Sequence, residues 1–249
     1  MNRSTTSTLA VQASRLHGRV IPRSALTTQL EDAMFALLAS HFTGVDRRVF
    51  QADLAEKSSV ILLEDDEGLV HGFSTMLVYD TMAPGRPVTV VYSGDTIMDR
   101  ECWGSPALAR TWIHAVRHMA QTDRHEVYWL LLTSGYRTYR FLPVFFKTFY
   151  PRCDEETPAA EHAVLDAIAG ERFASHYDAA AGVVRLAHPY VLAEDLVSVP
   201  SGRIADANIA FFLSRNPGFV AGDELVCLTR VGDDNLTPAG RRMAGIQRS

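Results

Sequence analysis

The spacing of apolar residues switches from a helical to a strand-like period within the first third of the chain. Apolar residues recur at steps of three and four over residues 30–42, which predicts a helix ended by Gly44, and a second short helix is expected around Leu54. Residues 58–65 and 69–80 are apolar runs separated by an Asp-Glu-Gly turn. Two runs joined in this way are typical of an antiparallel hairpin.

The middle of the chain continues this order with a strand, a helix and a buried strand. Residues 87–98 predict a third strand, in which Gly94 indicates a bulge or the close approach of another group. Ser105 suits the N-cap of the next helix, and Pro106 suits its first position. Residues 125–134 are almost all apolar, so we expect a fourth strand that is buried on both faces.

The second half carries weaker signals. Residues 136–150 predict an aromatic-rich helix that Pro143 kinks or divides. Helices are also expected over 159–173 and 203–215, and a late strand over 223–231. Together these elements predict one α/β domain with a mixed, centrally antiparallel sheet and an N-terminal helix pair.

No shift in composition divides the chain into two domains. We expect a flexible N-terminal arm over residues 1–18, which are rich in Ser and Thr, and a polar tail over 232–249. The single domain then spans 19–231 and contains an insertion over about 152–200.

Composition narrows the class of protein. Of 249 residues, 47% are hydrophobic and 21% charged, which excludes a disordered or fibrous chain. The net charge of −5 provides no basic surface for nucleic acid. We expect no membrane span, because no apolar stretch approaches the ~18 residues that one requires. With no signal-peptide pattern at the N-terminus, a cytoplasmic location is expected.

The spacing of cysteine and histidine residues does not indicate disulfide bonds or a metal site. The three cysteines (Cys102, Cys153 and Cys227) are far apart and form no Cys-x-x-Cys motif. His114 and His118 have the spacing of metal ligands on a helix, but no acidic residue accompanies them at a suitable offset. The sequence therefore predicts no metal site.

The segment TIMDRECWGSPALARTW (residues 96–112) resembles the strand–loop–helix element of the GNAT acyltransferase superfamily. Met98, Asp99, Glu101 and Gly104 match the spacing of that element. The resemblance implies a GNAT-like sheet flanked by helices and a coenzyme A site at the loop. Free N–H groups and the dipole of a helix N-terminus independently favour a phosphate there. The family's loop contains more glycines, whereas Gly104 is the only one here.

The resemblance also implies where an acyl donor would lie, whether acyl-CoA or an acyl group on the phosphopantetheine arm of an acyl carrier protein. No permanently bound cofactor is expected. The residues expected to contact the donor are Ile97, Met98, Trp103, Gly104, Ser105, Ala107 and Phe145.

Four residues are candidates for catalysis. Residues 134–152 resemble the family segment whose tyrosine protonates the departing thiolate, which suggests Tyr139 first and Tyr136 second; the alternative is that both fill the core. Asp95 is the candidate base, because burial in an apolar strand would raise the pKa of its carboxyl group. It could equally be a strand residue that faces solvent. His71 is a second candidate base, or a half-buried structural histidine.

The chain is longer than small acetyltransferases, and in this it resembles N-acyl amino acid synthases that use acyl carrier protein. We therefore expect transfer of a medium or long fatty acyl chain to an amine of an amino acid, another small molecule or a peptide, by direct attack on the thioester. An apolar cleft for the chain is expected among Phe141, Phe145, Phe146 and Trp129. The alternatives are an acetyl-CoA-dependent N-acetyltransferase and a catalytically silent domain that binds a ligand or partner.

Overall fold

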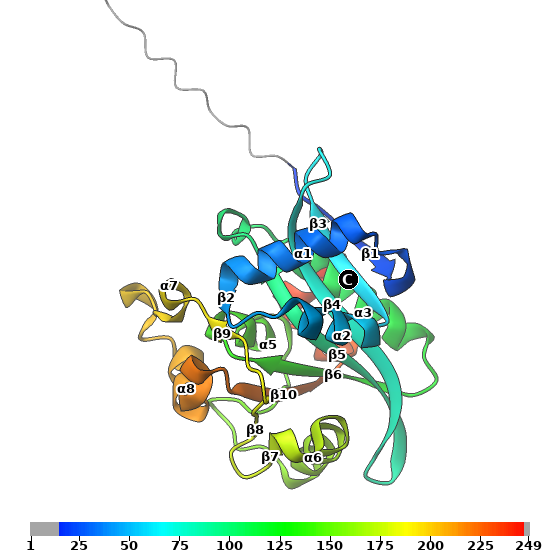
Figure 1. Cartoon of the computed structure of the whole chain (residues 1–249). Helices are drawn as coiled ribbons and strands as arrows, with labels where there is room; N and C mark the ends of the chain where they lie inside the picture. The colour runs from blue at the N-terminus through cyan, green and yellow to red at the C-terminus, as the bar shows by residue number, and fades with distance from the viewer. Residues whose placement is uncertain (1–14, 247–249) are drawn as a thin grey trace, which may run out of the picture.

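A mixed eight-stranded sheet forms the centre of the computed structural model, which describes residues 15–246 (Figure 1). The strand order is β1-β3-β4-β5-β6-β10-β8-β7. Strands β5 and β6 pair in parallel, and their neighbours pair antiparallel, which confirms the expected mixed, mainly antiparallel sheet. The strands are β1 (His17–Pro22), β3 (Ser59–Glu64), β4 (Val70–Ala83), β5 (Arg86–Met98), β6 (Glu126–Thr133), β7 (Tyr177–Asp178), β8 (Val183–Val184) and β10 (Glu224–Arg230). A two-stranded sheet pairs β2 (Phe42–Thr43) with β9 (Val191–Leu192).

Helices cover both faces of the large sheet. They are α1 (Thr28–His41), α2 (Arg47–Glu56), α3 (Ala107–Thr122), α4 (Tyr136–Tyr139), α5 (Phe141–Phe145), α6 (Ala159–Phe173), α7 (Glu194–Val197), α8 (Ala207–Arg215) and α9 (Pro238–Met243). The 3-10 helices are η1 (Arg23–Ala25), η2 (Arg100–Cys102), η3 (Ala174–His176), η4 (Ser201–Arg203), η5 (Pro217–Ala221) and η6 (Asp233–Asn235).

Alternation along the strands sorts their side chains between two layers. In β3, Ile61 and Leu63 pack in the core that contains α3, whereas Val60 and Leu62 pack in the core that contains α1 and α2. Helix α6 covers the same face as α1 and α2, farther along the sheet, over a separate cluster of buried residues (Figure 1). Arg172 of α6 forms an ion pair with Glu56 of α2, which links the two parts of this layer.

The first half of the chain follows its predicted order closely, with small shifts at helix ends. Helix α3 begins at Ala107, so Pro106 and not Ser105 occupies the N-cap position. The Ser105 hydroxyl still accepts a hydrogen bond from the Ala107 N–H, at 3.3 Å. Helix α8 begins at Ala207, later than predicted, because Asp206 caps it by accepting from two backbone N–H groups.

The helix predicted over 136–150 is wrong beyond Phe145. The helical segment divides at Arg140, and the chain is extended from Phe146 onward. Backbone pairing with the last strand accounts for this, because the Tyr150 N–H donates to the Leu228 carbonyl at 2.9 Å. The aromatic residues in this stretch therefore serve the core as part of an irregular chain.

Both ends contain more structure than expected. Strand β1, which was not predicted, includes two residues of the expected arm and pairs with β3; residues 1–14 of that arm lie outside the described part. The expected polar tail contains helical structure over 233–246. There η6 and α9 pack on the core through Leu236 and Ala244, each 3% exposed. Asn235 anchors this segment by donating from its amide to the Thr148 carbonyl at 3.0 Å.

The segment after α6 returns across the molecule to the first helices. Strands β7 and β8 extend the sheet beyond β10, and β9 then pairs with β2 at the end of α1. Arg137 in α4 donates to the Leu196 carbonyl at 2.9 Å, and Arg100 pairs with Asp195. This return brings Tyr190 next to the α1–α2 layer.

Candidate active site

Strands β5 and β6 separate near the middle of the sheet. Their parallel pairing ends at Ser93 and Leu131, whereas β5 continues to pair with β4 as far as Met98. The β4–β5 register shifts between Ser74 and Met76, which marks a bulge at the same level. The backbone of β5 after Ser93 is therefore unpaired on the side that faces β6.

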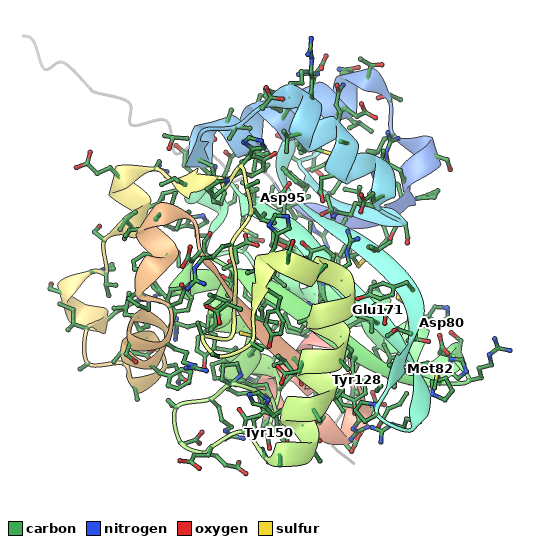
Figure 2. The ribbon with its side chains drawn as sticks, turned by 60° about the horizontal axis from the view of Figure 1, so that its bottom comes forward. Asp80, Met82, Asp95, Tyr128, Tyr150 and Glu171 are labelled. Atoms are coloured by element: carbon green, nitrogen blue, oxygen red, sulfur yellow. The ribbon has the colours of Figure 1, made fainter. Side chains whose placement is uncertain are left out.

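Four ionisable side chains gather beside this separation, on the face covered by α1, α2 and α6. We call Asp53, Lys57, Asp95 and Glu224 the carboxylate cluster. Figure 2 shows Asp95 between the α1–α2 layer and α6. The Lys57 side chain is fully buried, and its ammonium donates to Asp53 at 2.6 Å.

The two other acids of the cluster are half-buried and unusually weak. Burial, and then the charge of Asp53, raise the pKa of Asp95 to about 7, and Lys57 opposes the shift. Burial and the charges of Asp95 and Asp53 raise the pKa of Glu224 to about 8. Groups with these pKa values can accept and return a proton near neutral pH.

Gly94 allows the cluster to approach β5 closely, as its place in the strand predicted. A Cβ at this position would lie 2.7 Å from the Thr75 hydroxyl and 3.0 Å from Cε of Lys57. The Lys57 ammonium also lies 4.9 Å from the centre of the Tyr92 ring. Any side chain at residue 94 would force the Thr75 hydroxyl or the Lys57 side chain to shift.

The opposite side of the separation is apolar and filled. The rings of Trp112 and Trp129 lie 4.1 Å apart, and the Trp129 indole donates to the Ser93 hydroxyl at 2.9 Å. A cavity of about 20 Å³ remains, which has room for about one water molecule. We call this the tryptophan pocket; it is lined by Ser74, Thr96, Leu108, Trp112, Trp129, Leu131, Thr138 and Phe141.

The loop that leads into α3 keeps some backbone donors free. The N–H groups of Cys102 and Ser105 are bonded within the loop, and that of Ala107 donates to the Ser105 hydroxyl. Within residues 15–246, the N–H groups of Leu108 and Ala109 have no hydrogen-bond acceptor, as expected for a first helical turn. These donors and the helix dipole favour an anion.

Arginines surround this loop. The Arg137 guanidinium stacks on the Trp103 ring at 4.5 Å, and the Trp103 indole donates to the Met98 carbonyl at 2.9 Å. Burial and the charges of Arg203 and Arg100 lower the pKa of Arg137. A diphosphate at the loop would relieve this mutual repulsion.

The structure does not bring Tyr139 to the carboxylate cluster. Its ring packs against Phe212, with centroids 5.8 Å apart, and its hydroxyl donates to the Pro151 carbonyl at 3.0 Å. Burial raises the pKa of Tyr139, so the proton is held firmly. Tyr136 follows the end of β6, and its hydroxyl has no hydrogen-bond partner among the described residues.

The residues expected to contact the donor occupy several environments. The side chain of Ile97 packs in the α1–α2 core and so faces away from the tryptophan pocket. Met98, Ala107 and Phe145 pack, partly buried, against the α3 core, and nothing fills the space beside Gly104. Of the residues expected to form an acyl cleft, Trp129 and Phe141 line the tryptophan pocket, whereas Phe146 packs against Trp129, with ring centroids 5.7 Å apart.

His71 links Asp65, which follows β3, to Asp99, which follows β5. Its ring nitrogens each lie 2.9 Å from a carboxylate oxygen, one of Asp65 and one of Asp99. Although burial lowers the pKa of His71, these hydrogen bonds raise it overall. Within residues 15–246, no three His, Cys, Asp or Glu side chains are grouped to hold a metal. None of the helices described there combines the length and apolar character needed to cross a membrane.

Sequence reasoning missed Asp53, Lys57, Glu224 and Tyr190. Two signals were present in the sequence. Lys57 is one of two lysines in the chain, and Glu224 begins an apolar strand. Their convergence depends on strand order, which places β10 beside β6 although 90 residues separate them in sequence.

Comparisons with known proteins give structural similarity alone. No protein-family model matches the chain, and no curated protein matches it. A probable N-acyltransferase of Enterococcus faecalis V583 aligns at 13% identity and a TM-score of 0.41, over 53% of this chain and 33% of that one. An Escherichia coli GNAT family N-acetyltransferase in complex with CoA aligns at 18% identity and a TM-score of 0.38, over 52% of this chain and 68% of that one. An aminoglycoside N-acetyltransferase in complex with CoA aligns at 16% identity and a TM-score of 0.38, over 53% of this chain and 86% of that one.

This chain thus spans about a third of the Enterococcus protein. With identities and TM-scores this low, the similarities carry no argument about activity. A functional assignment must come from the geometry of the site.

Proposed function

We propose that this chain is an N-acyltransferase that transfers a short acyl group from a thioester such as acetyl-CoA to an amine. The observation that carries the proposal is the position of Asp95 where β5 and β6 separate; its carboxyl group has a pKa of about 7 and no hydrogen bond or ion pair within residues 15–246. An ammonium group is not a nucleophile, so the reaction needs such a base beside the acceptor.

In the proposed reaction, Asp95 takes one proton from the ammonium group and releases it to solvent. The resulting amine nitrogen bonds to the thioester carbonyl carbon while its second proton passes to Asp95. A backbone N–H of β5, left unpaired beyond Ser93, polarises the carbonyl oxygen. The carbon–sulfur bond then breaks, and the departing thiolate takes a proton from Tyr136. We assign this role to Tyr136 in place of Tyr139, because the Tyr139 hydroxyl is already bonded to Pro151.

The donor is proposed to enter from the α3 side. The free N–H groups of Leu108 and Ala109, with Arg137 nearby, suit the diphosphate of coenzyme A. The thioester would then reach the tryptophan pocket. A pocket of about 20 Å³ favours a short acyl group over the fatty chain expected from sequence, and even a short group requires Phe141 or a tryptophan to move.

The test measures release of free coenzyme A from acetyl-CoA by the full chain with a panel of primary amines. The blank contains protein without acetyl-CoA, because Cys153 is exposed and would react with a thiol reagent. We expect turnover with at least one amine, and a loss of about 100-fold or more in Asp95→Asn. Glu156→Gln, which alters an exposed acid outside the site, should keep full activity.

Two results would overturn the proposal. One is equal turnover by Asp95→Asn and the unaltered protein. The other is the absence of both turnover and thermal stabilisation by acetyl-CoA, which would favour the catalytically silent domain.

A further inference from the structure

The carboxylate cluster contains more negative charge than a base alone requires. Asp53, Asp95 and Glu224 supply three carboxylates, and Lys57 supplies one ammonium. Lys57 is satisfied by Asp53 at 2.6 Å. Within residues 15–246, the side chains of Asp95 and Glu224 have neither a hydrogen bond nor an ion pair, although both are half-buried.

Two hydroxyl groups in the same region also have no partner. Thr75 is fully buried, and its Oγ1 has no hydrogen-bond partner in the described part of the chain. This atom lies 2.7 Å from the point where a Cβ of residue 94 would stand, beside the Lys57 side chain. The buried Tyr190 hydroxyl likewise has no partner, and the charges of Asp95 and Asp53 act on it.

Buried polar groups in folded proteins are nearly always satisfied, by the protein, by water or by a ligand. A buried acid without a partner is especially unfavourable. Two carboxylates and two hydroxyls around Lys57 and Gly94 therefore lack partners among residues 15–246, which indicates a ligand that brings hydrogen-bond donors and positive charge.

On the basis of the proposed function, we infer that the acceptor is a dication: a diamine, or an amine that carries a second cationic group. Asp95 receives the reacting amine, and Glu224 binds the second positive charge. Glu224 is thus a specificity-determining residue. Two positive charges would neutralise the cluster, since three carboxylates and one ammonium leave a net charge of −2 when all are ionised.

Glu224 is well placed for this selection. It begins β10 and lies on the sheet face that carries Val226 and Leu228, opposite the face of Leu225. Burial and the charge of Asp95 both raise the pKa of Glu224, as expected of acids that share one space. An acceptor with one charge would satisfy Asp95 and leave Glu224 without a partner.

The experiment compares straight-chain diamines of three to six carbons with the corresponding monoamines, using acetyl-CoA and the full chain. We expect the best diamine to exceed its monoamine by about 30-fold or more in kcat/KM. Glu224→Gln should reduce this ratio to within a few-fold of one by lowering diamine use, while Glu156→Gln should preserve it. The melting temperature of each variant confirms folding.

Titration calorimetry with the same amines, without acetyl-CoA, separates this inference from the proposed function. Binding of a diamine that Glu224→Gln weakens, without any acyl transfer, would support the dication site and overturn the acyltransferase. Acyl transfer with equal use of monoamines, or a ratio that Glu224→Gln leaves unchanged, would overturn the dication site and leave the acyltransferase standing. Neither binding nor transfer would overturn both.

Discussion

The two sides of the separation between β5 and β6 differ in polarity and in how closely their side chains pack. On the α1–α2 side, the carboxylate cluster is polar and holds two acids without partners. On the α3 side, Trp112 and Trp129 pack closely and leave a pocket of about 20 Å³. The first side holds polar groups that have no partner among residues 15–246, whereas the second is filled by aromatic rings. The proposed donor site therefore has to open before an acyl group can enter.

Two tyrosine variants test which hydroxyl protonates the departing thiolate, and they carry the largest expected effect. Tyr136→Phe removes the proposed proton donor, so we expect turnover to fall by about 10- to 100-fold with folding unchanged. Tyr139→Phe removes the hydrogen bond to Pro151 and should cost about 1 kcal/mol of stability with turnover kept. Coenzyme A release and thermal melts measure both variants. The reverse pattern would return the catalytic role to Tyr139.

Gly94 tests whether turnover depends on the close approach of the carboxylate cluster to β5. In Gly94→Ala, the new Cβ meets the Thr75 hydroxyl and Lys57 Cε, so one of them must shift. We expect a loss of about 1–3 kcal/mol of stability and about tenfold lower turnover. Denaturant unfolding and the transfer assay measure the two effects. Unchanged turnover in a destabilised variant would separate the cluster from catalysis.

Phe141 tests whether the tryptophan pocket sets acyl length. Phe141→Ala should enlarge the pocket and raise use of octanoyl-CoA relative to acetyl-CoA by about three- to tenfold. Phe145→Ala is the matched control, since its ring lies 5.5 Å from that of Phe141 but does not line the pocket. Equal ratios in the two variants would mean that the acyl group lies elsewhere.

The smallest expected effect concerns stability and pH. Because the pKa of Asp95 is raised from 3.8 to about 7, the folded state holds its proton more tightly than the unfolded state does. Folding stability contributed by this group is therefore present at low pH and is lost as pH rises from about 4 to 7. Asp95→Asn cannot ionise and so does not lose this stability. We therefore expect the melting temperature of Asp95→Asn, minus that of the unaltered protein, to be about 2–4 °C larger at pH 8 than at pH 4. A constant difference would indicate an ordinary pKa.

These predictions rest on features that sequence revealed unevenly. Apolar patterns predicted α1, β3 to β6 and α3: the helices repeat apolar residues at steps of three and four, and β3 and β6 are short continuous apolar runs. Strand β1 has a burial pattern with a single buried residue, Ile21, so it carried no period to detect. The end of α5 depends on a backbone pairing between Tyr150 and Leu228, which local propensity cannot reveal.

The site was predicted only in part for the same reason. Asp95 and Gly94 could be found within one strand, by a carboxylate and a glycine in an apolar run. Glu224 and Tyr190 reach the cluster from β10 and from the segment that returns after α6, and their positions are set by long-range topology. The family resemblance favours Tyr139 over Tyr136, but the sequence does not show that the Tyr139 hydroxyl bonds to the Pro151 carbonyl.

The most direct test of the account is the pH dependence of kcat/KM for acyl transfer, measured for the unaltered protein and for Asp95→Asn with the same amine. The account predicts a rise in the unaltered protein centred near pH 7, where Asp95 loses its proton. In Asp95→Asn this rise should disappear, and the residual rate should follow the ionisation of the amine at higher pH. The same rise in both proteins would contradict the assignment of Asp95 as the base.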